Sequence, residues 1–368
     1  MYKIFCDYHH SGLAYSLKKL FEDRLGGSIY FPIGLDWRDK GFWKVFDHPD
    51  TAQQYLRLDQ VVVPKDNTPV LNRVVQKNED CYLVDEKAHH YLQKMVTFDQ
   101  FLKLDLDFII ASIPEHIEPF NKLCKLHPKK PKLIFQAGNN FNLRHFADRG
   151  LIKYVMYSAR PKYYHEKIDH IIYHQEFDEI YFDRRQHLEI SGWSLKHNTK
   201  KTIYCFINCY GTQANYKSDW VRFQSLEKRL ADFEFKSYGG GSRDGAISGI
   251  ENVSDKIKEA RFIWHCKQGG DGFGHIIHYA ACMGKVILTN LRDYRGQLAG
   301  EFLEDGYTCI DIDNCEIDEI VEKICYYDRP TTYEKMSKNL IKEYKEYVNF
   351  DREENMIARF IERVKKGS

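Results

Sequence analysis

The chain has 368 residues, more than one compact domain of ordinary size, so its length favours two domains. Hydrophobic residues make up 43% and charged residues 29%, a balance typical of globular proteins that argues against a disordered chain. Lys and Arg (54) offset Asp and Glu (53), so the net charge of +1 argues neither for nor against binding to nucleic acid, and only a local patch could do so.

Two features of the sequence concern the compartment. No apolar run approaches the roughly 18 residues that cross a bilayer, and the opening MYKIFCDYHHSG predicts a first strand rather than a leader. The ten cysteines form no CxxC pair, and several lie in apolar runs such as TIYCFINC, which predicts reduced thiols. We therefore expect a cytoplasmic protein without a membrane span.

In the first half, short apolar runs alternate with amphipathic stretches, as in a parallel sheet covered on both faces. YKIFCDY predicts a first strand, and LAYSLKKLFEDRLGG predicts a helix that ends at Gly26-Gly27. Further strands are expected at residues 107–111, 132–136, 154–157 and 170–173. Residues 33–97 are less regular and rich in aromatic and charged side chains, so we expect insertions there.

The alternation lapses near residue 181 and resumes at KTIYCFINCYG. From there the pattern predicts, in order, the helix SLEKRLADF, the strand EFKSYGGG, the helix VSDKIKEA, the strand RFIWHCK, the helix HIIHYAACMG and the strands KVILTN and YTCIDI. We therefore expect an α/β fold of two Rossmann-like doubly wound domains, residues 1–180 and 201–350, joined by a linker at 181–200 and facing a central cleft. Residues 351–368 predict an amphipathic helix that packs back on the first domain.

The segment RFIWHCKQGGDGFGHIIHYAACMGKVILTN carries the strongest functional signal. It predicts a buried strand, a glycine-rich loop, a helix and another buried strand. Gly269, Gly270, Gly272 and Gly274 let backbone amides approach an anion, and the helix N-terminus adds its positive dipole end. The pattern indicates a phosphate-bearing ligand. The alternative is a tight connection without a ligand.

The same segment resembles the donor-binding motif of retaining GT-B glycosyltransferases of the glycosyl transferase group 1, or family four-like, type. Asp271-Gly272-Phe273-Gly274 matches the first half of that motif, and Ala280-Ala281-Cys282-Met283-Gly284 with VILTN matches the second. The likeness extends over roughly residues 200–315. It implies the GT-B fold and transfer of a hexose or pentose from a nucleotide-sugar, most simply a UDP-sugar, to an acceptor hydroxyl. The donor would be a co-substrate, and no obligatory cofactor is implied.

Two positions depart from the family motif. The first acidic residue is Asp271 instead of the usual Glu, and the second acidic position is Tyr279, flanked by His278. The family holds the ribose with that second carboxylate, so the identity of the nucleotide and the retaining or inverting outcome stay open. Asp271 is expected to serve the sugar, with a helix N-cap as the alternative.

The resemblance implies that cations and backbone amides stabilise the leaving diphosphate. Lys217, Arg243 and Arg295 are the expected cations, with Arg292 as a further candidate, although any of them can equally be a solvated surface charge. The turn at Gly239–Gly241 is expected beside the nucleobase, with a flexible loop as the alternative. The predicted donor residues are Lys217, Gly239, Gly240, Arg243, Gly270, Gly272, Phe273, Gly274, His278, Tyr279 and Arg295.

The predicted catalytic residues are Asp271 and His10, which follows the first strand, where an imidazole can act as general base on an acceptor hydroxyl. Other strand ends supply predicted acceptor contacts, with plain turn chemistry as the alternative. This acceptor-side set is His9, Ser11, Gly12, Asn139, Asn140 and Arg160. No HExxH, Asp-x-Asp or Cys/His cluster at ligand spacing occurs, so no metal is predicted and transfer is expected to be metal-independent.

The acceptor is the least defined part of the prediction. Basic clusters at residues 122–132 and 196–201 are either solvated faces or a surface for a polyanion such as DNA. The opening HHSGLAYSLKKLFEDRLGG is also similar to glycosyltransferase-like proteins of large bacteriophages, which would place the protein in the host cytoplasm and makes a hydroxymethylated DNA base one acceptor hypothesis. The alternatives are a saccharide, lipid or protein acceptor, an epimerase-like or hydrolytic enzyme, and a non-catalytic nucleotide-sugar-binding protein. The sequence does not predict an oligomeric state.

Overall fold

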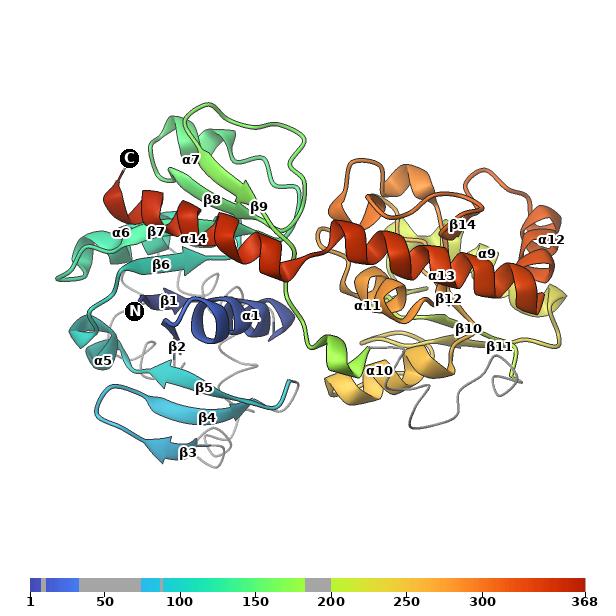
Figure 1. Cartoon of the computed structure of the whole chain (residues 1–368), viewed down its shortest axis with the longest axis horizontal. Helices are drawn as coiled ribbons and strands as arrows, with labels where there is room; N and C mark the ends of the chain where they lie inside the picture. The colour runs from blue at the N-terminus through green and yellow to red at the C-terminus, as the bar shows by residue number, and fades with distance from the viewer. Residues whose placement is uncertain (8–10, 33–73, 87–88, 183–199, 368) are drawn as a thin grey trace. The chain divides into compact units, whose positions relative to one another are not determined.

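The structure, a computed structural model, describes residues 1–7, 11–32, 74–86, 89–182 and 200–367 (Figure 1). The chain divides into two compact units. The first unit comprises Met1–Phe177 together with Phe350–Ser368, and the second comprises Asp178–Asn349. Most of the predicted linker, residues 183–199, lies outside the described residues.

The first unit is built on a mixed sheet with the described strand order β3-β4-β5-β2-β1-β6-β7-β8-β9. Its strands are β1 (Lys3–Cys6), β2 (Ser28–Pro32), β3 (Val74–Lys77), β4 (Tyr82–Glu86), β5 (Tyr91–Val96), β6 (Phe108–Ala111), β7 (Lys132–Ala137), β8 (Tyr154–Tyr157) and β9 (Asp169–Ile172). Strand β1 pairs in parallel with both β2 and β6, while β3, β4 and β5 form an antiparallel meander. The chain therefore reverses its direction of winding between β1 and β6.

The strands predicted in the first half are present at or within one residue of their expected positions, but the meander β3–β5 was not predicted. It falls in the irregular stretch 33–97, of which residues 33–73 lie outside the described residues. Strand β3 is exposed from Val75 to Lys77. Exposed edge strands of an antiparallel sheet carry charged side chains, so they lack the continuous apolar run by which a buried parallel strand is predicted.

Successive residues of β1 point to opposite faces of the sheet, Ile4 and Cys6 into one core and Phe5 into the other. The Phe5 face is covered by α5 (Phe98–Lys103), α6 (Ile117–Leu126) and α7 (Arg144–Asp148). The opposite face is covered by α1 (Ser11–Lys18) and by the C-terminal helix α14 (Phe350–Lys366), which buries Phe360 and Ile361 there. Helix α1 continues as a π-helical turn, Lys19–Arg24, before Gly26 turns the chain with a φ of 64°.

The second unit holds a parallel sheet with the described order β11-β10-β12-β13-β14. Its strands are β10 (Thr202–Cys205), β11 (Glu234–Ser237), β12 (Phe262–Trp264), β13 (Val286–Thr289) and β14 (Cys309–Asp311). Its helices are α9 (Lys217–Arg229), α10 (Ile250–Glu259), α11 (His275–Met283), α12 (Ile317–Tyr327) and α13 (Pro330–Tyr347). Side chains of α9, α12 and α13 pack into one core with β10, β12 and β13. In this sheet the winding reverses between β10 and β12.

Short 3-10 turns complete the described structure: Pro114–His116, Glu179–Tyr181, Ala214–Tyr216, Leu291–Asp293 and Leu298–Gly300. The ten cysteines are free thiols. In the part of the chain that the structure describes, no helix is both long and apolar enough to cross a membrane.

Candidate functional site

The carboxyl edge of the second sheet collects the loops that carry most of the predicted donor residues. The loops after β10 and β12 leave neighbouring parallel strands at the point where the winding reverses. In open α/β sheets, that point forms a crevice in which ligands bind. The loop after β12 contains the glycine-rich run, and the loop after β13 contains Arg292 and Arg295.

The glycine-rich loop is packed against the loop that follows β13. Gly269, Gly270 and Gly274 have φ values of 81°, 71° and 80°, which side chains with a Cβ rarely adopt. A Cβ on Gly270 would lie 2.3 Å from the carbonyl oxygen of Asp293, and the Gly269 N–H donates to Asp293 Oδ1 over 3.1 Å. Glycine at 270 is therefore required for the close approach of the two loops.

Helix α11 begins where this loop ends. Gly274 precedes its first turn in a left-handed conformation, and the amide of His278 donates to the Gly274 carbonyl over 3.1 Å. The amides at the start of a helix have no partner within the helix and carry its positive dipole end, so they suit an anion. Asp271 makes no side-chain cap to α11, and the N-cap alternative for this residue is therefore wrong.

The Asp271 carboxylate is held by two side chains of its own loop. Its Oδ2 lies 2.5 Å from His265 Nε2, and its Oδ1 accepts a hydrogen bond from Lys267 Nζ. Burial acts to raise the pKa of Asp271, but the charges and hydrogen bonds of His265 and Lys267 outweigh it and lower the pKa well below its ordinary value. Asp271 is therefore an anion at any working pH.

His278 and Tyr279, the predicted donor residues at and beside the second acidic position of the family motif, lie in the interior of the second unit. His278 is fully buried, and its ring stacks on Phe273 at 4.0 Å while Nδ1 lies 2.9 Å from the Gly274 carbonyl. Tyr279 is buried against Phe182, with ring centroids 4.1 Å apart. Phe273 and these two rings thus pack against protein, and their roles toward a ligand stay predictions.

The predicted cations divide into two groups. Arg243 is paired with Glu227 and Asp244 and donates to the Phe235 carbonyl, so its guanidinium is already satisfied by protein. Lys217, the first residue of α9, and Arg295 are exposed. Among the described residues, neither of these two side chains has an ion-pair partner, which leaves both charges available to an anion.

The predicted nucleobase turn is ordered by the loop that follows β10. Gly239 has a φ of 136°, and a Cβ there would lie 2.9 Å from both Asn208 Oδ1 and the Ile207 carbonyl oxygen. The Gly240 N–H donates to Asn208 Oδ1 over 2.9 Å. These contacts argue against the alternative of a flexible loop, and a nucleobase role stays a prediction.

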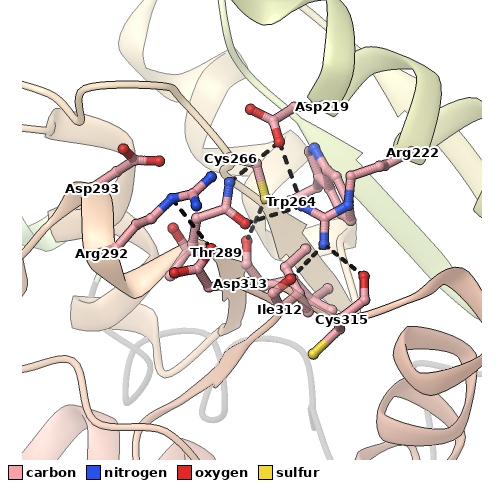
Figure 2. A network of polar contacts seen from close by, with 12 residues as sticks. Asp219, Arg222, Trp264, Cys266, Thr289, Arg292, Asp293, Ile312, Asp313 and Cys315 are labelled. Atoms are coloured by element: carbon pink, nitrogen blue, oxygen red, sulfur yellow. Dashed lines mark hydrogen bonds and ion pairs between the residues drawn. The ribbon is translucent and has the colours of Figure 1, made fainter.

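Arg222 of α9 forms hydrogen bonds with residues that directly follow β13 and β14, as Figure 2 shows. Its guanidinium donates to Asn290 Oδ1 over 3.1 Å and to the carbonyls of Ile312 and Cys315, and Asn290 donates to Asp219 over 3.2 Å. The neighbouring Arg292 lies 3.2 Å from Asp313 Oδ1. This network fixes the loop on which the glycine-rich run rests.

The corresponding edge of the first sheet is closed by a buried acid-histidine pair. Asp7, directly after β1, accepts hydrogen bonds from the backbone N–H and the hydroxyl of Ser112, which follows β6, over 2.8 and 2.5 Å. His116 Nδ1 lies 2.5 Å from Asp7 Oδ2, the oxygen that also accepts the backbone N–H of Ser112. Burial acts to raise the pKa of Asp7, but His116 and Ser112 lower it below the ordinary value.

This cluster was not predicted from the sequence, although Asp7 lies in the predicted first strand and Ser112 and His116 follow the strand predicted at residues 107–111. His116 is fully buried, and its Nε2 has no hydrogen-bond partner among the residues that the structure describes. The predicted base His10 and its neighbour His9 lie outside the described residues, while Ser11 and Gly12 form the first turn of α1. Polar residues at the ends of β1 and β6 were the available signal, because adjacent parallel strands end at one edge of a sheet.

The predicted acceptor residues Asn139, Asn140 and Arg160 follow β7 and β8. Asn140 lines a cavity of about 700 Å³ at this edge, and its Oδ1 accepts the backbone N–H of Lys162 over 2.9 Å. Phe141, Tyr157, Tyr163 and Tyr164 supply aromatic walls. The charged side chains that line the cavity are those of Arg144, Lys162, Asp148 and Glu166. Within the described part of the chain, the charged groups of Arg144 and Lys162 have no partner.

Several solved structures of similar fold are glycosyltransferases. A glycosyltransferase from Rickettsia africae ESF-5 has a TM-score of 0.61 and 12% identity, with 100% of both chains covered. HepE from Anabaena, in complex with UDP and glucose, has a TM-score of 0.61 and 10% identity over 98% of this chain and 100% of its own. An alpha-glucosyltransferase in complex with UDP and a 13-mer DNA has a TM-score of 0.58 and 8% identity over 97% and 99%.

This chain has the GT-B fold. The prediction of two Rossmann-like doubly wound sheets is thereby confirmed. No protein-family model and no curated protein sequence matches the chain.

Within the GT-B fold, the basic cluster at 122–132 lies away from the edge that carries the cavity. It spans the end of α6 and the start of β7, the amino end of that strand, whereas Asn139 and Asn140 follow its carboxyl end. His127 is buried, and Lys129 pairs with Asp105 over 3.0 Å. Most of the second cluster, 196–199, lies outside the described residues. The basic cluster at 122–132 therefore does not line the carboxyl edge of the first sheet.

Proposed function

We propose that this protein is a glycosyltransferase that moves a sugar from a UDP-sugar to an acceptor hydroxyl. One observation carries the proposal: the carboxyl edge of the second GT-B sheet combines a glycine-rich loop, the start of α11 and the exposed cations Lys217 and Arg295. Structures of similar fold have been solved with UDP, UDP and glucose, or UDP-glucose. This combination is what a nucleoside diphosphate needs from a protein.

The chemistry of transfer explains why these groups suit the reaction. As the glycosidic bond to the diphosphate breaks, positive charge develops on the sugar ring and negative charge accumulates on the leaving phosphate. The amides at the head of α11 and the charges of Lys217 and Arg295 would stabilise that negative charge. Because these groups supply positive charge themselves, we propose that transfer proceeds without a bound metal, so that a chelator leaves the rate unchanged.

We further propose that the acceptor is a hydroxymethylated base of DNA. The similarity to an alpha-glucosyltransferase solved with DNA supports this choice. The cavity beside β7 and β8 supports it as well, because aromatic side chains stack on bases and the unpaired Arg144 and Lys162 attract phosphates. Tyr163, 86% exposed, is the most accessible of these rings.

The test is to measure UDP release from several UDP-sugars with four acceptor conditions. These are hydroxymethylated DNA, unmodified DNA of the same sequence, free saccharides and no acceptor. The proposal expects release only when the hydroxymethylated DNA is present. Release of UDP with free saccharides would indicate a saccharide acceptor instead of DNA. Release of UDP without any acceptor would indicate a hydrolase. UDP binding without any turnover would indicate a non-catalytic protein.

A matched pair of variants sharpens the acceptor part of the test. Arg144→Ala together with Lys162→Ala should raise the KM for DNA several-fold and leave the KM for the UDP-sugar unchanged, since a phosphate contact affects binding of the polyanion alone. Lys122→Ala together with Lys125→Ala, in the cluster that lies away from this edge, is the control. Equal effects of the two pairs would contradict the assignment of the cavity.

A further inference from the structure

The partners of Asp271 restrict what this residue can do for a ligand. Both carboxylate oxygens are engaged, one by His265 and one by Lys267, and only 14% of the side chain is exposed. His265 is itself buried, with 4% of its side chain exposed, so the surrounding protein holds its ring in place. Tyr294 is buried as well, and burial together with the charge of Asp271 raises the pKa of its hydroxyl. The side-chain contacts of the Asp271 carboxylate are therefore made within its own loop.

Lys267 differs from Asp271 in its access to solvent. Its side chain is 30% exposed, and its ammonium is bonded to Asp271. Burial acts to lower the pKa of Lys267, but Asp271 outweighs this effect and raises it, so the lysine stays charged. An ammonium has three N–H donors, so it can keep Asp271 and still donate to a second anion.

The backbone places this ammonium at the entrance to the glycine-rich loop. Lys267 follows the end of β12 by three residues, and its carbonyl accepts the N–H of Gly270 over 2.8 Å, which closes a turn. The loop then continues through Gly272 and Gly274 into the first turn of α11. Lys267 is thus a fixed positive charge in the same loop whose amides suit a phosphate.

From these contacts we propose that Lys267 binds the diphosphate of the donor, and that Asp271 is a positioning residue that holds the lysine in place. His265 in turn orients Asp271. This inference rests on the proposed UDP-sugar site and differs from the role that the sequence motif implied for Asp271, a direct contact with the sugar. If Lys267 binds the diphosphate, disturbing it lowers the affinity for UDP and UDP-glucose alike. If Asp271 contacts the sugar, its replacement lowers the affinity for UDP-glucose alone.

The experiment is calorimetric titration of the full chain with uridine, UDP and UDP-glucose. Lys267→Met should weaken UDP and UDP-glucose by roughly ten- to a hundredfold and leave uridine unchanged, because uridine lacks the phosphates. Lys267→Arg should restore most of the affinity, because a guanidinium can bond both Asp271 and a phosphate. A merely structural role of Lys267 would instead lower the affinity for uridine together with that for UDP. Asp271→Asn should weaken UDP and UDP-glucose in parallel by a smaller factor.

A control and a melting curve keep the result interpretable. Lys256→Met removes a lysine whose partner is Glu259 on α10 and should leave all three affinities unchanged. If Asp271→Asn does not fold, Lys267→Met and Lys267→Arg still decide the question. Unchanged UDP binding by Lys267→Met overturns the inference, as does a loss of UDP-glucose but not UDP in Asp271→Asn. Absence of UDP binding by the wild type would instead contradict the proposed function.

Discussion

The two sheets end in contrasting ways at the points where their winding reverses. Between β1 and β6 the edge holds Asp7, Ser112 and His116, which are buried and form hydrogen bonds with one another. Between β10 and β12 the edge carries glycines with positive φ and the exposed Lys217. The same reversal of winding is therefore occupied in the first unit by buried polar side chains that bond to one another. In the second unit it carries glycines and an exposed positive charge. The second is the edge that suits a phosphate.

Removing the carboxylate of Asp7 should have the largest effect on stability. Asp7→Ala leaves buried donors of Ser112 and His116 without an acceptor, so we expect a loss of about 3–5 kcal/mol in the free energy of unfolding. Urea denaturation of the full chain measures it. Asp23→Ala, which removes an exposed partner of Lys18, should cost less than about 1 kcal/mol. Similar costs for both variants would show that the first edge is not held by Asp7.

The same carboxylate should make stability depend on pH on the acid side. The folded-state pKa of Asp7 is lower than that of the unfolded chain, so its contribution is complete above about pH 4 and is lost as the pH falls further. Unfolding measured between pH 6 and pH 3 should therefore show a shallower acid decline for Asp7→Asn than for the wild type. A steeper decline in the variant would contradict the direction of the shift.

Gly270→Ala should disturb the second edge through the backbone. The left-handed φ costs about 1–2 kcal/mol for a residue with a Cβ, and contact with the Asp293 carbonyl must also push the two loops apart. We expect a larger loss of stability than for Gly269→Ala, which has a similar φ but no atom within 4 Å of its Cβ. UDP affinity should fall by roughly tenfold or more in Gly270→Ala only. Equal behaviour of the two variants would contradict the role given to this contact.

Lys217→Met and Arg295→Met should have the smallest effects, confined to binding. Each removes a charge that has no partner among the described residues, so the free energy of unfolding should change by less than about 0.5 kcal/mol. UDP affinity measured by calorimetry should fall about tenfold in each, which corresponds to about 1.4 kcal/mol. Arg243→Met offers the contrast, because its guanidinium is bonded to protein and its removal should lower stability instead. Unaltered UDP binding by both Lys217→Met and Arg295→Met would remove them from the site.

The buried parallel strands and the glycine-rich loop could be predicted because their signals are local. The run FIIA is apolar throughout, the run VILT is apolar up to its final threonine, and the four glycines lie within one stretch of six residues. The pairing of Asp7 with His116 was not predictable in the same way. These residues are 109 positions apart, and only the adjacency of β1 and β6 brings them together.

Side-chain pairing inside a loop was equally hidden from the sequence. Arg243 and Arg295 look alike as cations near strand ends, yet one is bonded to Glu227 and the other is exposed. His278 and Tyr279 are predicted to be donor residues from their position in a family motif, but both side chains are buried in the structure. A motif fixes the path of the backbone, whereas the direction of each side chain depends on what packs around it.

Hydrogen exchange of the full chain with and without UDP tests the contrast between the two edges most directly. The account predicts that UDP slows exchange in the peptides that cover residues 265–278 and 290–297. Peptides that cover residues 1–7 and 108–120 should be unaffected. Protection at the first edge instead of the second, or no protection with any nucleoside diphosphate, would contradict the assignment of the second edge as the nucleotide site.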